Sequence, residues 1–182
     1  MMGRPLVLLD VDGVINDLGV ADGQSRSYGI HELESNGFTL HIPDYMPELI
    51  QGLLAVADVW WCTTWLHDAN AEVATHLGID QLPVIEAGAG DGPDWKVEGS
   101  KELVTDALAA GGQVYWIEDF EGSPPSLDMP DGVVFIDTAV DRDGPVLRPA
   151  DLADMLRVAN ERDRHVTRQR APARGTKEPD GE

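Results

Sequence analysis

The chain of 182 residues lacks the features of a membrane protein or a disulfide-rich domain. Its single cysteine, Cys62, excludes an internal disulfide and a cysteine-based zinc site, and we expect a small buried thiol there. No apolar run approaches the roughly 20 residues that a membrane-spanning helix needs. Asp10 and Asp12 interrupt the apolar stretch near the N-terminus, which argues against a signal peptide. We therefore expect a cytoplasmic protein that does not bind membranes.

Basic side chains are also scarce. The chain has 13 Lys and Arg residues against 33 Asp and Glu residues, which gives a net charge of −20. Residues 1–160 carry 7 basic and 28 acidic side chains, a net charge of −21. Because phosphate contacts normally come from Lys and Arg, this composition weakens non-specific attraction to nucleic acid. It leaves open a contact with a nucleic-acid end, since a bound cation changes the local field.

The most informative segment that is present is residues 6–13, Leu-Val-Leu-Leu-Asp-Val-Asp-Gly. The apolar run suits one buried strand, and Gly13 permits a sharp turn after it. Asp10 and Asp12 therefore follow the end of a strand, where open α/β sheets bind their ligands. Two carboxylates this close repel each other unless a proton or a cation lies between them. Mg²⁺ is the expected cation, because it prefers carboxylate oxygen and keeps waters that a phosphate can replace.

Two other interpretations of this segment compete with a magnesium site. Asp and Gly are common turn residues, so the motif also suits a plain surface turn. A calcium-binding EF-hand loop requires Gly at its sixth position and Glu at its twelfth. Counted from Asp10, those positions hold Ile15 and Ala21, so the EF-hand interpretation fails.

Functional side chains follow two further predicted strands. Residues 56–65 are β-branched and aromatic, and they lead into Thr63 and Thr64. Residues 113–117 lead into Glu118 and Asp119, and Lys96 lies between the two segments, just ahead of a predicted helix. An acid pair, a hydroxyl, a lysine and a second acid pair thus occur in that order. Their order and their placement at strand ends together predict a phosphoryl-transfer site.

The pattern of elements predicts an α/β fold, a doubly wound and mainly parallel sheet with helices on both faces. Residues 1–165 would form one domain, and residues 17–44 an insertion within it that contains a short strand at 38–42. Residues 87–94 are rich in glycine and predict a loop, and residues 166–182 predict a disordered tail. The remaining elements are expected as strands at about 6–10, 57–62, 83–85, 113–117 and 133–136, and as helices from Pro47, near 68–77, at about 100–110 and from about Asp151.

From about Leu6 to Asp137 the chain resembles the haloacid dehalogenase (HAD) superfamily, whose members are mostly Mg²⁺-dependent phosphatases. The resemblance rests on Asp10-Val-Asp-Gly-Val14, on Thr63 within Trp-Cys-Thr-Thr-Trp, on Lys96 and on Glu118-Asp119. The tryptophans beside these motifs resemble a compact subgroup that includes HAD domains associated with RNA-repair proteins. The resemblance implies that the first strand lies near the sheet centre, with the strands ending near 62 and 117 beside it.

The resemblance also implies a role for each residue. Asp10 would attack phosphorus to form an aspartyl-phosphate, and Asp12 would act as general acid and then as general base. Thr63 and Lys96 would bind the phosphate. The Mg²⁺ ligands would be Asp10, the backbone carbonyl of Asp12 and Asp119, with Glu118 either sharing this role or only forming a hydrogen bond nearby.

Several assignments stay open at this point. A one-residue shift would exchange Thr63 for Thr64, and Lys101 could replace Lys96 from within the following helix. His31 and His41, in the insertion, are exposed loop residues or substrate contacts. We expect the tryptophans to be packing residues rather than substrate platforms. These tryptophans are Trp61, Trp65, Trp95 and Trp116. Separately, we expect Asp137, Asp141 and Asp143 to lie in turns.

The expected function is therefore that of a Mg²⁺-dependent phosphatase acting on a phosphomonoester. The insertion at 17–44 is too short for a full cap domain and suits a flap. The substrate would be a small molecule or a nucleic-acid end, and the oligomeric state is not indicated. The alternatives are a non-catalytic, metal-binding HAD-like module acting through a protein or nucleic-acid partner, and transfer of phosphate to an acceptor other than water.

Overall fold

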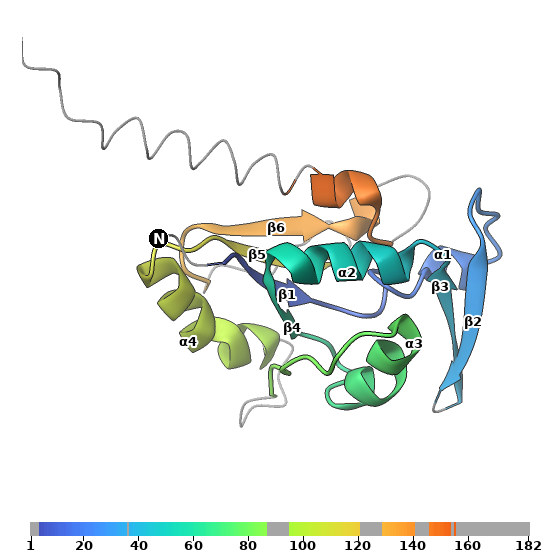
Figure 1. Ribbon diagram of the computed structural model, residues 1–182, viewed down its shortest axis with the longest axis horizontal. Helices are drawn as coiled ribbons and strands as arrows, with labels where there is room; N and C mark the ends of the chain where they lie inside the picture. Colours follow the sequence, from blue (N-terminus) through green and yellow to red (C-terminus); the bar gives the residue numbers. More distant parts are fainter. Residues whose placement is uncertain are drawn as a thin grey trace, which may run out of the picture.

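Four parallel strands form the main sheet of the molecule (Figure 1). The computed structural model describes residues 4–35, 37–86, 95–120, 129–140, 146–153 and 155. The strand order is β4-β1-β5-β6, with every neighbouring pair parallel. The α/β class and the central position of the first strand are thus confirmed. The four strands are β1 (Leu6–Leu9), β4 (Asp58–Trp61), β5 (Val114–Glu118) and β6 (Val133–Asp137).

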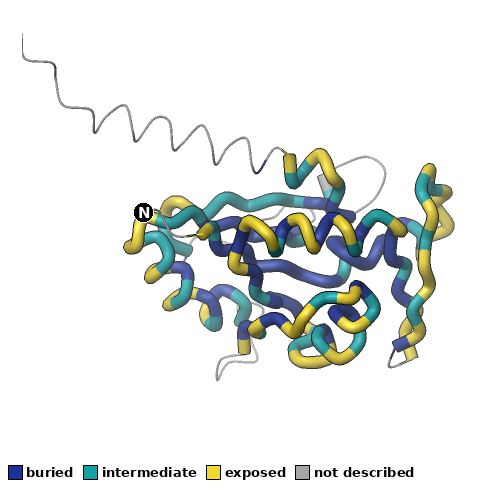
Figure 2. The backbone as a smooth tube through the Cα atoms, viewed as in Figure 1, coloured by how far each residue is buried: buried dark blue, intermediate teal, exposed yellow. Residues whose placement is uncertain are grey.

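The continuous apolar run of β1 reflects burial on both faces of the sheet. Its four residues are all buried, and they alternate between two hydrophobic clusters. Val7 and Leu9 face one cluster, whereas Leu6 and Leu8 face the other. Because period-two alternation sends side chains to opposite faces, only a strand covered on both sides is apolar at every position. Figure 2 shows this burial along the central strands.

Helices cover both faces of the sheet, as the sequence predicts. The cluster with Val7 and Leu9 contains side chains of α2 (Met46–Val56), of the π-helical turn η1 (Ala69–Ala74) and of α3 (Thr75–Leu77). The opposite cluster contains side chains of α4 (Trp95–Ala109). The helix predicted near 68–77 ends as expected at Gly78, which has a φ of 65°.

Two of the predicted elements differ from the structure. The helix expected at about 100–110 begins at Trp95, so Lys96 lies in its first turn rather than ahead of it. Val97 and Val104 are buried against the sheet, which explains why the helix extends to this point. The strand expected at 83–85 is reduced to one bridge between Trp61 and Val84, because Pro83 has no N–H for a longer ladder. Residues 87–94 and the predicted tail lie outside the described residues, as do Asp141 and Asp143.

Residues 17–44 form a helical turn and a β-hairpin. The turn is α1 (Leu18–Ala21), and the strands are β2 (Ile30–Ser35) and β3 (Phe38–Pro43), which pair in antiparallel register. The sequence predicts a strand at 38–42 but not its partner. The hairpin stands beyond the end of the sheet toward which β6 points (Figure 1). No helix among the described residues is long and apolar enough to cross a membrane.

A buried ion pair fixes the start of this insertion. Asp17 is fully buried, and its two carboxylate oxygens accept hydrogen bonds from the guanidinium of Arg26. The hydroxyl of Tyr28 and the backbone N–H of Gly19 donate to the same carboxylate, at 2.6 and 3.0 Å. The Tyr28 ring meets that of Tyr45 edge to face, with centroids 5.2 Å apart. These contacts tie the segment before the hairpin to the start of α2.

Candidate functional site

The site lies where the winding direction of the sheet reverses. From β1 the chain moves to β4 and to the bridge at Val84 on one side, and then returns to β5 on the other side of β1. A crevice forms at the carboxyl ends of the two strands that flank such a reversal, and ligands of open α/β sheets bind there. Asp10 follows β1 and Glu118 ends β5, so both carboxylates lie at the carboxyl ends of the strands that flank this reversal.

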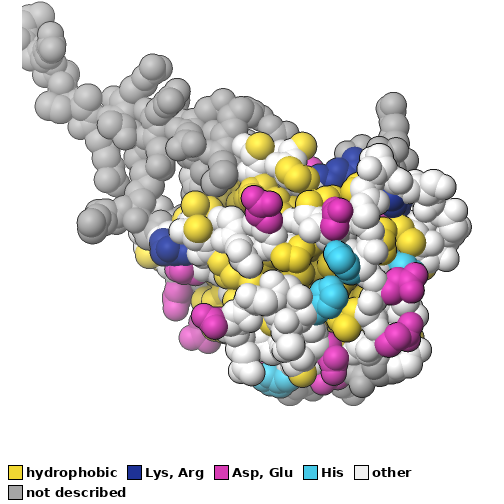
Figure 3. All heavy atoms as spheres, turned by 45° about the vertical axis from the view of Figure 1, so that its right-hand side comes forward, with side chains coloured by type: hydrophobic (Ala, Val, Ile, Leu, Met, Phe, Trp, Pro, Cys, Tyr) yellow, Lys and Arg dark blue, Asp and Glu magenta, His cyan; other side chains and the backbone are white. Residues whose placement is uncertain are grey.

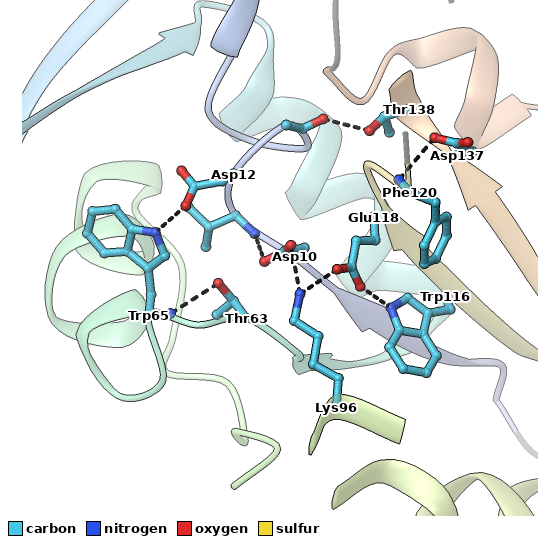
Figure 4. A network of polar contacts seen from close by, with 12 residues as sticks. Asp10, Asp12, Thr63, Trp65, Lys96, Trp116, Glu118, Phe120, Asp137 and Thr138 are labelled. Atoms are coloured by element: carbon cyan, nitrogen blue, oxygen red, sulfur yellow. Dashed lines mark hydrogen bonds and ion pairs between the residues drawn. The ribbon is translucent and has the colours of Figure 1, made fainter. Parts of the chain in front are cut away.

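One lysine joins these two carboxylates. The Lys96 Nζ donates to Asp10 Oδ2 at 2.9 Å and to Glu118 Oε1 at 2.6 Å (Figure 4). The side chain of Lys96 is only 12% exposed and that of Asp10 only 9%. The early start of α4 makes this contact possible, because it places Lys96 in the first helical turn beside the strand ends. The sequence leaves Lys96 and Lys101 open; the structure brings Lys96 to Asp10, whereas Lys101 is exposed.

The charges of this cluster are unequal. Burial lowers the pKa of Lys96, but the nearby carboxylates of Asp10 and Glu118 outweigh burial and leave that pKa above its ordinary value. Burial raises the pKa of Glu118, and the opposing effect of Lys96 does not cancel it. Lys96 thus holds its proton more tightly than an ordinary lysine. Its single positive charge faces the two carboxylates of Asp10 and Glu118. The cluster keeps an excess of negative charge that a further cation would relieve.

Asp12 has a different set of partners. Its Oδ2 accepts from the indole Nε1 of Trp65, and its Oδ1 accepts from Nδ2 of Asn16, both at 2.9 Å. Both donors are neutral. Asn16 is itself held by the hairpin, because its Oδ1 accepts from the backbone N–H of His41 at 2.8 Å. Asp12 is therefore fixed between the segment after β4 and the hairpin, and it points away from Lys96 (Figure 4).

A tight turn separates the two aspartates from the hairpin. The carbonyl of Val11 accepts from the N–H groups of Val14, Ile15 and Asn16. Gly13 has a φ of 69°, which L-residues other than glycine adopt with strain. The hydroxyl of Thr138 donates to the carbonyl of Gly13 at 2.6 Å. The backbone turn that follows Asp10 and contains Asp12 is thus fixed by hydrogen bonds within the turn and by one from Thr138.

Asp119 joins the site through Gly13. A Cβ atom built on Gly13 would lie 2.3 Å from Oδ2 of Asp119, so the carboxylate packs directly against the glycine backbone. Any side chain at this position would displace Asp119. Asp137, expected in a turn, accepts from the N–H groups of Phe120 and Ala139 and so fixes the segment that follows Asp119. Asp119 therefore lies beside the turn that carries Asp12.

The two threonines after β4 occupy different environments. Thr63 is fully buried, and its Oγ1 accepts from the backbone N–H of Trp65 at 3.3 Å. Thr64 is exposed and lines a cavity of about 690 Å³ together with Asp12 and Trp65. Both residues follow the strand beside β1. Thr63 is thus enclosed at the end of the strand, whereas Thr64 faces the cavity beside Asp12.

The acidic side chains at this edge offer oxygen donors, the kind of ligand that Mg²⁺ prefers. Among the residues that the structure describes, no three His, Cys, Asp or Glu side chains form a common metal site. Mg²⁺ needs fewer, because it binds through one or two carboxylates and completes its shell with water and substrate phosphate. Asp10 and Asp119 supply such carboxylates, and the close approach of Asp119 to Gly13 places it next to the backbone of Asp12.

Like Asp10, whose Oδ1 also accepts from the backbone N–H of Val11 at 2.7 Å, Glu118 has a donor for each of its carboxylate oxygens. Its Oε1 accepts from Lys96, and its Oε2 accepts from the indole Nε1 of Trp116 at 2.7 Å. Both carboxylate oxygens therefore have a donor. Of the two roles that the sequence leaves open, these contacts correspond to the hydrogen-bonding one, with Glu118 orienting Lys96.

Sequence reasoning missed the roles of Trp65 and Asn16. Trp61 and Trp116 are buried, as expected of packing residues, and the half-buried Trp95 packs at the edge of its cluster. Trp65 is also half-buried, but its indole N–H reaches Asp12 across 53 residues of sequence. The position of Trp65 in a loop, two residues after Thr63, could have indicated its contact with Asp12. The four-residue spacing between Asp12 and Asn16 could likewise have indicated theirs.

The histidines of the insertion do not reach Asp10. His31 is exposed on β2, and its ring lies 6.2 Å from that of His76. His41 is half-buried on β3 and contacts the site only through its backbone, by way of Asn16. The expectation that both are exposed loop residues is wrong in two respects: both belong to the paired strands of the hairpin, and His41 is half-buried.

Comparison of the chain with family models, with curated proteins and with solved structures finds no significant match.

Proposed function

We propose that this chain is a Mg²⁺-dependent phosphatase that hydrolyses a phosphomonoester through an aspartyl-phosphate on Asp10. The observation that carries the proposal is the division of contacts between the two aspartates. Asp10 is paired with the ammonium of Lys96, whereas Asp12, two residues later, is held among the described residues by the neutral N–H donors of Trp65 and Asn16. A nucleophile needs to remain a carboxylate, and an acid/base group needs to exchange a proton, so the two environments suit two roles.

In the first step, a carboxylate oxygen of Asp10 attacks phosphorus and forms a new P–O bond. The bond between phosphorus and the alcohol oxygen breaks, and Asp12 in its acid form gives its proton to that oxygen. In the second step, Asp12 takes a proton from water, whose oxygen attacks phosphorus. The bond to Asp10 then breaks, which releases inorganic phosphate and restores both side chains.

The other residues would bind and stabilise the phosphoryl group. Lys96 would neutralise charge on the phosphoryl oxygens as well as on Asp10, and the hydroxyl of Thr63 would donate to one of them. Asp10, Asp119 and the backbone carbonyl of Asp12 would hold Mg²⁺. When bound, Mg²⁺ supplies charge stabilisation for the equatorial oxygens. The resemblance to the HAD superfamily supports the same assignment of roles.

The test is phosphate release from p-nitrophenyl phosphate, nucleotides, sugar phosphates and phosphorylated oligonucleotides, with Mg²⁺ and with EDTA. We expect release that requires Mg²⁺ and falls by at least about 10⁴-fold in Asp10→Asn, because the amide cannot form the covalent intermediate. The matched control is Asp58→Asn. Asp58 is an exposed aspartate, and its contact with Arg4 is a surface ion pair. Its replacement should leave turnover unchanged.

Circular dichroism and thermal melting would establish that both variants are folded. A folded Asp10→Asn protein with wild-type turnover would overturn the proposal. Mg²⁺-dependent thermal stabilisation without turnover of any ester would favour the non-catalytic, metal-binding module. Product formation that requires an added alcohol would instead identify a phosphotransferase.

A further inference from the structure

A cavity lies on the side of Asp12 that faces away from Lys96. Its volume is about 690 Å³, within the range of small-molecule sites. It is enclosed by three parts of the chain: the turn after β1 with α1, the tip of the β2–β3 hairpin, and the loop after β4. The residues that matter for its chemistry are Asp12, Leu18, Phe38, Thr64, Trp65 and Asp68.

The cavity is placed to receive one part of a phosphomonoester. Asp12 is among the described residues that line it, whereas Asp10 is not. In an in-line displacement the leaving oxygen lies opposite the nucleophile and beside the general acid. With Asp10 as nucleophile and Asp12 as acid, the alcohol part of the substrate extends past Asp12. The cavity therefore corresponds to the space that the leaving group would occupy.

The lining of the cavity combines apolar and neutral polar side chains. Apolar side chains come from α1, the hairpin and the loop after β4, including Leu18, Phe38 and Trp65. Phe38, at the hairpin tip, is 67% exposed, an unusual state for a large aromatic side chain. Neutral polar groups come from the hydroxyls of Thr39 and Thr64 and from the amide of Asn16.

The charged groups of the lining are all of one sign. They are the carboxylates of Asp12 and Asp68, and none of the described residues that line the cavity is a Lys, Arg or His. Figure 3 brings the hairpin side of the molecule forward. Asp and Glu side chains are scattered over this face, and the visible Lys and Arg side chains lie near its margins. An anionic leaving group would meet like charges here, and the described lining residues offer it no Lys, Arg or His side chain.

We infer that the cavity is the leaving-group site of the proposed phosphatase, and that its substrates are phosphomonoesters of alcohols with an aromatic or apolar body and no negative charge. This inference rests on the proposed function. It makes phosphorylated nucleic-acid ends poor substrates, because their leaving groups carry further phosphates, whereas a nucleoside monophosphate would release an uncharged nucleoside with an aromatic base and is not disfavoured. Phe38 and Trp65 would contact the apolar body, and Thr64 would donate to or accept from its polar edge.

The first experiment measures binding without chemistry. Titration of the full chain with 2-naphthol, followed by calorimetry, should show binding with a negative heat-capacity change, which marks the burial of apolar surface. We expect Phe38→Ala to weaken binding by about tenfold. Because Phe38 is exposed, its replacement should not prevent folding. The control is Val56→Ala, at the exposed end of α2, which should bind 2-naphthol like the wild type. Absence of binding, or equal loss in both variants, would overturn the inference.

The second experiment compares two esters that differ by one charge. Phenyl phosphate should have a kcat/KM at least about tenfold above that of 4-carboxyphenyl phosphate, because the added carboxylate enters an acidic cavity. Phe38→Lys places a cation at the rim and should reduce this ratio by about tenfold, whereas Val56→Lys should leave it unchanged. Equal kcat/KM values for the two esters, or a ratio that Phe38→Lys does not alter, would overturn the inference.

The two experiments also separate this inference from the proposed function. Mg²⁺-dependent turnover without a preference for phenyl phosphate overturns the leaving-group assignment and keeps the phosphatase. Binding of 2-naphthol without turnover of any ester overturns the phosphatase and the leaving-group role together, and supports the ligand class alone.

Discussion

Two aspartates on the same stretch of chain are paired with a cation, and they differ in how their charge is balanced. Asp17 is bound by Arg26 through two hydrogen bonds, with further donors from Tyr28 and Gly19. Burial raises the pKa of Asp17, but the hydrogen bonds from Arg26 and Tyr28 outweigh it and leave the pKa below its ordinary value. Each oxygen has its donors, and one cation serves one anion.

Asp10 shares its cation. Lys96 divides its contacts between Asp10 and Glu118, and the pKa of Glu118 is raised by burial despite the nearby ammonium. The ion pairs of Asp17 and Asp10 are distinguished by the net charge of each cluster. The charges of Asp17 and Arg26 cancel, whereas Asp10, Glu118 and Lys96 together keep a negative charge. A balanced buried pair holds a structure together, whereas an unbalanced one is suited to receive a cation and a phosphate.

Removal of Lys96 should produce the largest difference between the two pairs. Lys96→Met keeps the length of the side chain and removes the charge, so we expect kcat/KM to fall by about 10³-fold in the phosphatase assay. Lys101→Met, at an exposed position of the same helix, is the matched control and should retain wild-type activity. Equal activity of the two variants would contradict the role given to Lys96.

Removal of Arg26 should act on stability instead. Arg26→Met leaves a buried carboxylate without its cation, and we expect the free energy of unfolding to fall by about 3 kcal/mol. Turnover per folded molecule should change less than threefold. Asp58→Asn removes the exposed pair with Arg4 and should cost less than about 1 kcal/mol. Urea unfolding with an activity measurement on each variant would check both values, and a large activity loss without destabilisation would break the comparison.

Loss of a neutral donor should cost less than loss of a cation. Trp65→Phe keeps an aromatic ring but removes the N–H that donates to Asp12, a contribution of about 1 kcal/mol. We expect kcat for phenyl phosphate to fall by about fivefold, with KM changed less than twofold. A change confined to KM would show that Trp65 acts on substrate binding and not on the position of Asp12.

The smallest expected effect is in the pH dependence of stability. Because folding lowers the pKa of Asp17, its contribution is complete above the unfolded value of 3.8 and is lost as the pH falls through the folded value. The free energy of unfolding of Asp17→Asn should therefore decline less steeply than that of the wild type as the pH falls below about 4. Urea titrations from pH 3 to pH 6 would measure the two slopes, and equal slopes would contradict the assignment.

Strand ends were the most predictable part of this molecule. The apolar run before Asp10 and the aromatic runs before Thr63 and Glu118 are local signals, and all three strands form at the predicted places. Since parallel strands end at one edge of a sheet, the convergence of their side chains followed from topology. The resemblance supplied the strand order, which local patterns do not contain.

Contacts across the insertion were not predictable in the same way. The sequence of β2, Ile-His-Glu-Leu-Glu-Ser, mixes polar and apolar residues without a clear strand period, and it forms a strand because β3 pairs with it. The early start of α4 depends on packing of Val97 against the sheet. The partners of Asp12 depend on where the hairpin and the loop after β4 arrive in space, which no single segment encodes.

The lone thiol has a practical consequence. Cys62 follows β4 directly, is fully buried in the cluster beneath Lys96, and has a pKa raised by burial. Thiolate is the reactive form, so an alkylating reagent can modify Cys62 only when this part of the sheet opens. The rate of thiol labelling in the native protein thus measures the frequency of that opening. Addition of Mg²⁺ and inorganic phosphate should slow labelling if they bind across the strand ends, which makes the cysteine an intrinsic reporter of ligand binding.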